Sequence, residues 1–187
     1  MRKIIVEKYN PEWKTEFEKA EAFYQDLLKD VEVKIEHVGS TSVVGLWAKP
    51  ILDIDIIVKD TIDSQRVIEL LAGVGYIHIG NLGIEGREAF KYVENNPNIK
   101  WMEHHLYVCL NSCENLQSHL LLRNHLRCNK EAVEAYSEIK RQLAKEYPND
   151  IDSYIDGKTD LITGFLRAEG MNVDELDRIE SINKKDK

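Results

Sequence analysis

Apolar side chains recur at helical spacing in the first part of the chain. The helix predicted there runs through residue 29, and its apolar face carries Trp13, Phe17, Ala20, Tyr24 and Leu27. Asn10 and Pro11 precede it, and these residue types cap and open helices. A second helix is predicted with Asp63 or Ser64 as its cap and an end near Gly73. Further helices are predicted near residues 114–127, 130–146 and 150–168.

Runs of apolar or alternating residues predict the strands. Residues 31–38 alternate between apolar and polar positions, and residues 51–58 form a nearly continuous apolar run that two carboxylates interrupt. Because the predicted strands come before a cluster of helices, the pattern favours an α+β fold with a mixed sheet. Shorter runs predict further strands at residues 3–7, 75–80, 87–93 and 99–110, the last two joined by a turn at 94–98.

Length and charge narrow the class of protein. The 187 residues fit one domain, which we place at residues 1–170, followed by a charged, frayed C-terminal tail at 171–187. The net charge of −8 argues against non-specific nucleic-acid binding, which depends on lysine and arginine. No apolar run reaches the ~20 residues of a membrane span, and the first residues do not fit a signal peptide. We therefore expect a cytoplasmic protein whose three cysteines are reduced.

Asp53 and Asp55 are the first candidate site residues. Alternate residues of a strand share a face, so the two carboxylates point the same way with Cα atoms about 6.6 Å apart. Buried carboxylates are costly unless something offsets their charge, and Mg²⁺ prefers such hard oxygen ligands. A D-x-D pattern can also be structural, with both carboxylates in water at a strand end or bonded to backbone amides.

Gly39 and Ser40 lie in the loop after the strand predicted at residues 31–38. Glycine permits a tight turn or a close approach to a ligand, and the hydroxyls and amides that follow it suit phosphate. Alone, the pair also fits an ordinary turn with a helix cap. Together with the D-x-D strand it forms a pattern typical of nucleotidyltransferases, in which Gly-Ser holds nucleotide phosphates and the aspartates hold Mg²⁺.

The run HVGSTSVVGLWAKPILDIDIIV resembles the signature of the GrpB-like (UPF0157) family. The resemblance covers about residues 5 to 168 and implies a nucleotidyltransferase-like fold. The chain departs from the family pattern at Val44, Glu85, Tyr107 and Asn124, and the last two changes weaken a histidine ligand and a carboxylate role at those positions. Later blocks that agree with the family in order are residues 83–90, 104–108 and 123–127, then Tyr136, Lys140, Tyr154 and Lys158.

His105 is the central polar residue on one face of the strand predicted around residues 101–110. Nucleotidyltransferases usually bring a third carboxylate from a later strand, and Glu103, the one acid on this face, sits near the strand start. His105 could act as a base or contact a phosphate, or it could be a hydrogen-bonded sheet residue. Without a third carboxylate, nucleotide binding without catalysis becomes the stronger interpretation.

Basic side chains could complete a polyphosphate site. The candidates are Lys49, Arg87, Arg123 and Arg127, since arginine can grip phosphate with two parallel hydrogen bonds. Each arginine could equally be a solvated charge or the partner of a nearby acid. For Lys140 and Lys158, a solvated charge or the partner of a nearby acid is the stronger interpretation.

Our leading hypothesis is a metal-dependent nucleotidyltransferase-like protein that uses Mg²⁺ or Mn²⁺. Asp53 and Asp55 would hold the metal, His105 would complete the catalytic pocket, and the partner would be a nucleotide or another phosphorylated small molecule. The nucleotidyl group would move onto a hydroxyl or amine of a small molecule or protein. A second hypothesis is a non-catalytic module for a nucleotide or CoA-type ligand, and a third is an interaction protein whose D-x-D is structural.

Overall fold

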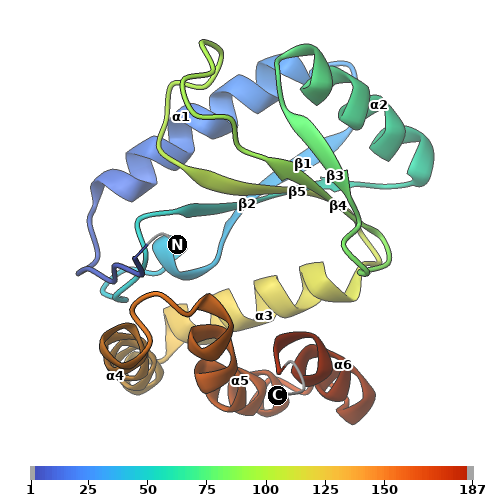
Figure 1. The fold of residues 1–187 in the computed structure, drawn as a ribbon. Helices are drawn as coiled ribbons and strands as arrows, with labels where there is room; N and C mark the ends of the chain where they lie inside the picture. Colours follow the sequence, from blue (N-terminus) through green and yellow to red (C-terminus); the bar gives the residue numbers. More distant parts are fainter. Residues whose placement is uncertain (1–2, 185–187) are drawn as a thin grey trace.

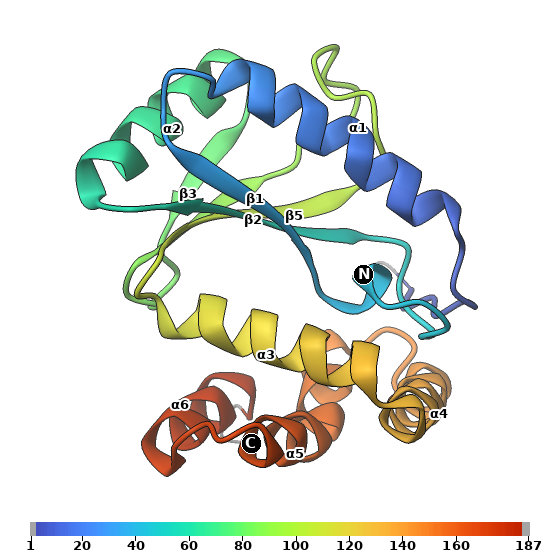
Figure 2. The same cartoon turned by 180° about the vertical axis from the view of Figure 1, so that it is seen from behind.

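A five-stranded mixed β-sheet lies at the centre of the protein. The computed structural model describes residues 3–184, so residues 1–2 and the last three residues of the predicted tail lie outside the described part. Helices α1 and α2 cover one face of the sheet, and α3 covers the other (Figure 1). Helices α4, α5 and α6 pack beyond α3, as the view from behind also shows (Figure 2), and we call α3 to α6 the helical cluster.

The strands run in the order β1-β2-β5-β4-β3 across the sheet. They are β1 (Val33–Val38), β2 (Leu52–Val58), β3 (Ile77–Gly80), β4 (Arg87–Lys91) and β5 (His104–Leu110). The helices are α1 (Glu12–Leu27), α2 (Thr61–Gly73), α3 (Glu114–Cys128), α4 (Lys130–Glu146), α5 (Ile151–Ala168) and α6 (Val173–Asn183), with a short 3₁₀ turn, η1, at Ser40–Ser42.

Strand β2, which carries both aspartates, lies inside the sheet and pairs with a neighbour on each side. It runs parallel to β5 and antiparallel to β1, and the remaining pairs are antiparallel. In register, Asp53 lies beside His105 on β5, while Asp55 lies beside Tyr107 on β5 and Glu36 on β1. Paired residues point to the same face, so these polar side chains all face the helical cluster. The mixed sheet confirms the α+β prediction.

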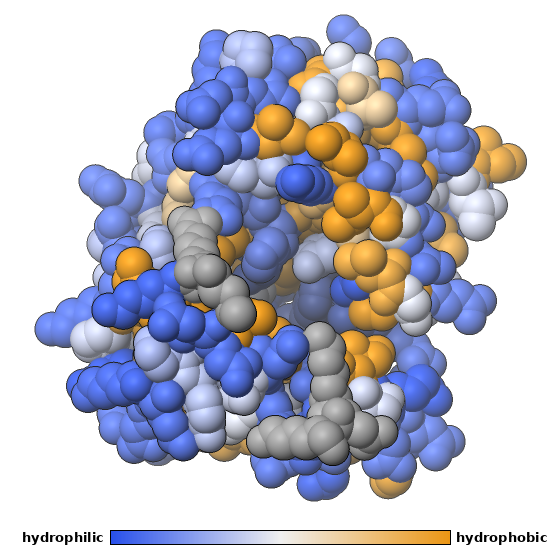
Figure 3. All heavy atoms as spheres, viewed as in Figure 1, coloured by the Kyte–Doolittle hydropathy of each residue, from blue (hydrophilic) through white to orange (hydrophobic). Residues whose placement is uncertain are grey.

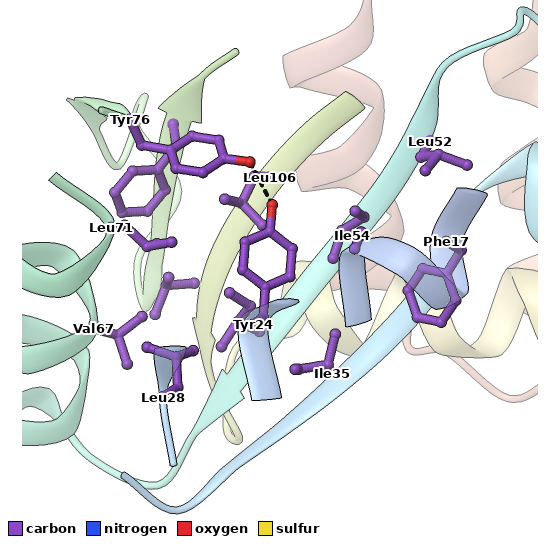
Figure 4. Packing of buried hydrophobic residues seen from close by; sticks show 14 of the residues in the cluster. Phe17, Tyr24, Leu28, Ile35, Leu52, Ile54, Val67, Leu71, Tyr76 and Leu106 are labelled. Carbon is purple, nitrogen blue, oxygen red and sulfur yellow. Dashed lines mark hydrogen bonds between the residues drawn. The ribbon is translucent and has the colours of Figure 1, made fainter. Parts of the chain in front are cut away.

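The main hydrophobic core lies between the sheet and helices α1 and α2. Leu52, Ile54 and Ile56 alternate with the two aspartates along β2 and are fully buried in this core. Burying a side chain of this size contributes about 1.5–3 kcal/mol relative to leaving it exposed. Figure 4 shows the Tyr24 and Tyr76 hydroxyls meeting within the same layer, 2.6 Å apart. Because the apolar face of β2 is buried in this core, Asp53 and Asp55 point to the opposite side of the sheet.

Several predicted boundaries were wrong. Residues 3–7 do not form a strand and contribute one isolated bridge, between Glu7 and Ala48. The cap of helix α2 is Asp60, three residues before the first predicted cap, because its carboxylate accepts hydrogen bonds from the amides of Ile62 and Asp63. Strand β5 begins at residue 104, so the connection from β4 is longer than the predicted turn at 94–98.

The C-terminal segment is helical where we expected fraying. Helix α6 begins with a capping box, in which Asn172 and Glu175 each bond the other's backbone amide. Met171 and Leu176 are buried against α3 and α5. The dense charge of this segment obscured its sparse apolar positions in the sequence. Among the described residues, no helix is both long and apolar enough to cross a membrane.

Candidate active site

Asp53 and Asp55 project from β2 toward α3, as the strand alternation predicted. His105 on β5 binds Asp53, with 2.9 Å between Nδ1 and Oδ1. His119 on α3 binds Asp55, with 2.8 Å between Nδ1 and Oδ2. Asp55 is completely buried, whereas the His105 side chain is about half exposed (48%). Each carboxylate therefore has an imidazole partner on the side that faces the helical cluster.

The two pairs set the protonation of the site. Burial alone would raise the pKa of Asp53, but the hydrogen bond and charge of His105 outweigh it and hold that pKa below its usual value. Burial would lower the pKa of His119, but the charge and hydrogen bond of Asp55 outweigh it and raise that pKa. Asp53 is thus ionised near neutral pH, and His119 holds its proton more firmly than a free histidine.

The turn at Gly39 lies directly against Asp53. Gly39 has φ +66°, and a Cβ atom built on it would stand 2.0 Å from Asp53 Oδ2, so only glycine fits. His37 supports the turn from below: its Nε2 lies 3.0 Å from Thr41 Oγ1, and its ring stacks on Phe17. Burial lowers the pKa of His37 to about 4, which leaves the ring neutral at pH 7.

A cavity of about 160 Å³ opens beside this turn. Its polar lining comprises Gly39, Ser40, Asp53, His119, Arg123 and Lys158. Ligand pockets are usually ~300–1,000 Å³, so this space suits a phosphate group better than a whole nucleotide. Figure 3 shows a polar recess in this face of the molecule, between the sheet layer and the helical cluster.

Two lysines from the helical cluster complete the site. Lys140 on α4 is only 2% exposed, and its Nζ donates to Ser40 Oγ over 3.0 Å. Burial and the nearby charges of Lys158 and Lys49 hold the pKa of Lys140 well below its usual value. Burial, aided by Lys49, also lowers the pKa of Lys158, to about 8. We expected both lysines to be solvated surface charges or partners of nearby acids, whereas Lys140 is buried against Ser40 and Lys158 lines the cavity.

The two lysines sit in matching local settings. Lys140 Nζ lies 4.4 Å from the ring centre of Tyr136, and Lys158 Nζ lies 5.0 Å from that of Tyr154. In each case the tyrosine precedes the lysine by four residues on one helix, so both side chains share a face. The aromatic face offsets part of the cost of burying an ammonium group. This repeated spacing was visible in the sequence and is the signal that could have identified both residues.

Of the predicted arginines, only Arg123 reaches the cavity. Its Nη1 donates to the Glu36 carboxylate and, over 3.0 Å, to the His37 carbonyl oxygen. Glu36 is a third acid on the same sheet face, opposite Asp55 on β1, whereas we expected such an acid on the strand around 101–110. His119 was not predicted either, although it stands one helical turn before Arg123. Both pairings join segments that are distant in sequence, so no local pattern indicates them.

Arg87 and Arg127 lie outside the cavity. The Arg87 guanidinium stacks on the Tyr107 ring at 4.6 Å and donates to Asn115 Oδ1 over 3.1 Å. Arg127 donates to the Ser42 carbonyl oxygen through two nitrogens, at 3.2 and 3.0 Å. Lys49 lies close enough for its charge to lower the pKa of Asp53 and Lys158. Arg87 and Arg127 thus contact residues around the site and do not converge on the aspartates.

The residues present fit a divalent cation only in part. Among the described residues, no three histidine, cysteine, aspartate or glutamate side chains converge as a metal-binding group. Asp55 Oδ1 is nevertheless buried without a hydrogen-bond partner, which leaves one hard oxygen able to coordinate. Mg²⁺ is commonly held by one or two carboxylates plus waters and substrate phosphates. The arrangement therefore fits an ion that arrives with a phosphorylated ligand.

Comparison with known proteins identifies the family of the chain. The GrpB protein family matches residues 3–168. The chain belongs to the GrpB family. This GrpB protein is 29% identical over 164 residues to glutamate-rich protein GrpB of Alkalihalophilus pseudofirmus, covering 87% of this chain and 94% of that one. It is 30% identical over 161 residues to UPF0157 protein YqkA of Bacillus subtilis, covering 86% of this chain but 46% of YqkA, so it spans about half of that relative.

Solved structures agree on the fold. The conserved protein GrpB from Enterococcus faecalis superposes with a TM-score of 0.76 at 31% identity, covering 93% of this chain and 98% of that chain. The Cid1 poly(U) polymerase, in a structure with MgGTP bound, superposes with a TM-score of 0.51 at 13% identity, covering 76% of this chain and 44% of that chain. At that identity the likeness shows the fold alone, and it confirms the predicted nucleotidyltransferase-like architecture.

Proposed function

We propose that this GrpB protein is a metal-dependent nucleotidyltransferase-like protein that acts on a small molecule or a protein. The observation that carries the proposal is the contact between the Gly39 turn and Asp53 at the edge of a cavity flanked by the buried Lys140 and the partly buried Lys158. A carboxylate on one side and cationic groups on the other suit a phosphate chain with a bridging cation. The likeness to a polymerase seen with MgGTP supports the choice of ligand class.

Mg²⁺ or Mn²⁺, when bound, would act as a Lewis acid on a phosphoryl oxygen. Asp53 and Asp55 Oδ1 are the oxygens that would hold it. His119 binds the other oxygen of this carboxylate, Asp55 Oδ2, over 2.8 Å. His119 would therefore hold the carboxylate in position and leave Oδ1 for the ion.

The cationic side of the cavity would bind the phosphates. Ser40, Lys140 and Lys158 line or flank the space, and Arg123 is held rigid between Glu36 and the His37 carbonyl. Without an anion, burial favours the neutral form of Lys140, because the charge of Asp53 offsets only part of the lost hydration. A phosphate beside it would restore the positive charge. The transfer would attach a nucleotidyl group to an acceptor hydroxyl or amine and release pyrophosphate.

The test combines binding and turnover. Nucleoside triphosphates with Mg²⁺ or Mn²⁺ are expected to raise the melting temperature, with about 2.7 kcal/mol of stabilisation at a hundredfold the dissociation constant. Pyrophosphate release should be measurable with the wild type and should fall at least ~100-fold in Asp53→Asn, because that change removes a metal-holding charge. Asp30→Asn, on the exposed turn after α1, is the charge-matched control and should behave as wild type.

A non-catalytic nucleotide- or CoA-type module is the second candidate. The observation that favours it is the pairing of both aspartates with histidines, together with His105 and Tyr107 in place of a carboxylate on β5. This module would be stabilised by the ligand without releasing pyrophosphate. If no nucleotide or CoA derivative, with or without metal, stabilises the protein, both proposals are wrong.

A further inference from the structure

Two cysteines meet at the turn between β5 and α3, away from the cavity beside Gly39. Cys109 is the penultimate residue of β5, and Cys113 is the N-cap residue of α3. The turn is closed by a hydrogen bond of 2.9 Å from the Cys113 amide to the Leu110 carbonyl oxygen. Both cysteines are buried in one small apolar cluster, and the Cys113 thiol donates to the Glu85 carbonyl oxygen over 3.4 Å. Two cysteines that one tight turn brings into the same cluster are placed to form a disulfide without a large backbone movement.

The surroundings of Cys113 favour its thiolate. The hydrogen bond from Cys109 lowers the pKa of Cys113 most, and the amides of Leu116 and Asn115 and the charge of Arg87 add to it, giving a pKa of about 6 despite burial. The pKa of Cys109 is raised by the same hydrogen bond and by burial. The pair therefore favours loss of the proton from Cys113 rather than from Cys109, which is the order expected of a reactive cysteine and a resolving cysteine.

A cavity gives small molecules access to Cys113. It has a volume of about 580 Å³, and its lining includes Gly86 and Cys113 on one side and Met171, Arg178 and Ile179 on the other. Five of the fourteen lining residues come from the segment 171–182 around α6, beyond the residues that match the GrpB family. The third cysteine, Cys128, lies exposed at the opposite end of α3. It therefore serves as an internal reference thiol within the same chain.

We propose that Cys113 is a modification site for hydroperoxides, and that Cys109 resolves the product to a disulfide. The Cys113 thiolate attacks the distal peroxide oxygen, the O–O bond breaks, and hydroxide or alkoxide leaves, giving a sulfenic acid. The Cys109 sulfur then attacks the Cys113 sulfur, and the hydroxyl leaves as water with the Cys109 proton. Two thiols lose two electrons and one peroxide gains them. The product joins the end of β5 to the first turn of α3.

Peptide mapping of the wild-type protein tests this proposal without any variant. One equivalent of hydrogen peroxide should reduce the free thiols from three to one, and non-reducing mass spectrometry should find Cys109 linked to Cys113 with Cys128 free. Dithiothreitol should restore all three thiols. Loss of the Cys128 thiol before the pair, or a disulfide between two chains, would overturn the proposal.

Trapping identifies which cysteine is oxidised first. In Cys109→Ser, a cyclic diketone should label a sulfenic acid at Cys113, because no resolving thiol remains. In Cys113→Ser, Cys109 should stay reduced under the same treatment, and Cys128→Ser should still form the disulfide. Circular dichroism checks that each variant is folded. Labelling at Cys109 in folded Cys113→Ser would reverse the assigned roles and contradict the proposal.

Discussion

At the scale of single residues, the space beside Gly39 decides whether the site can form. Gly39→Ala should lower the free energy of unfolding by at least ~2 kcal/mol, because its Cβ would meet Asp53 Oδ2 as well as strain the backbone. Gly45→Ala is the matched control: it also has a positive φ, of +84°, but its Cβ would meet nothing within 4 Å. Urea denaturation of both variants measures the difference. Equal losses would show that the contact with Asp53 contributes nothing.

Lys158 gives the protein a measurable pH dependence. Its pKa is about 8 in the folded protein, against an ordinary 10.5, so below pH 8 the lysine is charged in both states and burial penalises folding. Between pH 8 and 10.5 the unfolded chain binds more protons, and stability from this group rises with pH. Lys158→Met should therefore stabilise the protein at pH 7, on the order of 1 kcal/mol after solvent screening, and the gain should shrink by pH 9.5. Denaturant titrations at both pH values measure it, and a gain that grows with pH would contradict this account.

Residue chemistry was predictable where it depended on neighbours in sequence. The common face of Asp53 and Asp55 followed from alternation, and the need for glycine at position 39 followed from the turn. Pairings between distant segments were not predictable: Lys140 meets Ser40 across 100 positions and His119 meets Asp55 across 64. The repeated spacing of tyrosine and lysine marks Lys140 and Lys158 in the sequence, but it does not say whether their helices face solvent or a cavity. Only the docking of α4 and α5 distinguishes the two.

At the scale of elements, α6 formed where we expected a charged, frayed tail. Leu176→Ala should lower the free energy of unfolding by about 2–5 kcal/mol, since the side chain is fully buried among α3 and α5 residues. Ile182→Ala, on the same helix but with 53% of the residue exposed, should cost less than about 1 kcal/mol. Chemical denaturation compares the two variants. A negligible cost for Leu176→Ala would mean that α6 does not pack stably in solution.

Long periodic segments were predicted more reliably than short ones. Strand β2 and helix α1 were predicted well because long periodic stretches leave few alternatives. The segment at residues 3–7 has the composition of a strand, but no neighbouring strand pairs with it beyond the bridge at Glu7. A segment forms a strand only if another strand pairs with it, and the local sequence does not show whether such a strand is present.

At the scale of the whole molecule, the cavity beside Gly39 lies where the sheet layer meets the helical cluster. Its walls come from residues 38–40 and Asp53 on one side and from α3, α4 and α5 on the other. A nucleoside triphosphate with Mg²⁺ should therefore slow amide hydrogen exchange in both walls, with no change in α2 on the far face of the sheet. Exchange measured by mass spectrometry tests this. Slowing confined to one wall would place the ligand elsewhere.

The buried Lys140 has a further consequence for selectivity. Because burial holds its pKa well below the usual value, this amine adds little standing positive charge to attract chloride, acetate or other monovalent anions from solution. A polyanion strong enough to draw a proton onto Lys140 would create part of its own counter-charge as it enters. Discrimination would then depend on the ligand's charge density as well as on the fixed charges of Arg123 and Lys158.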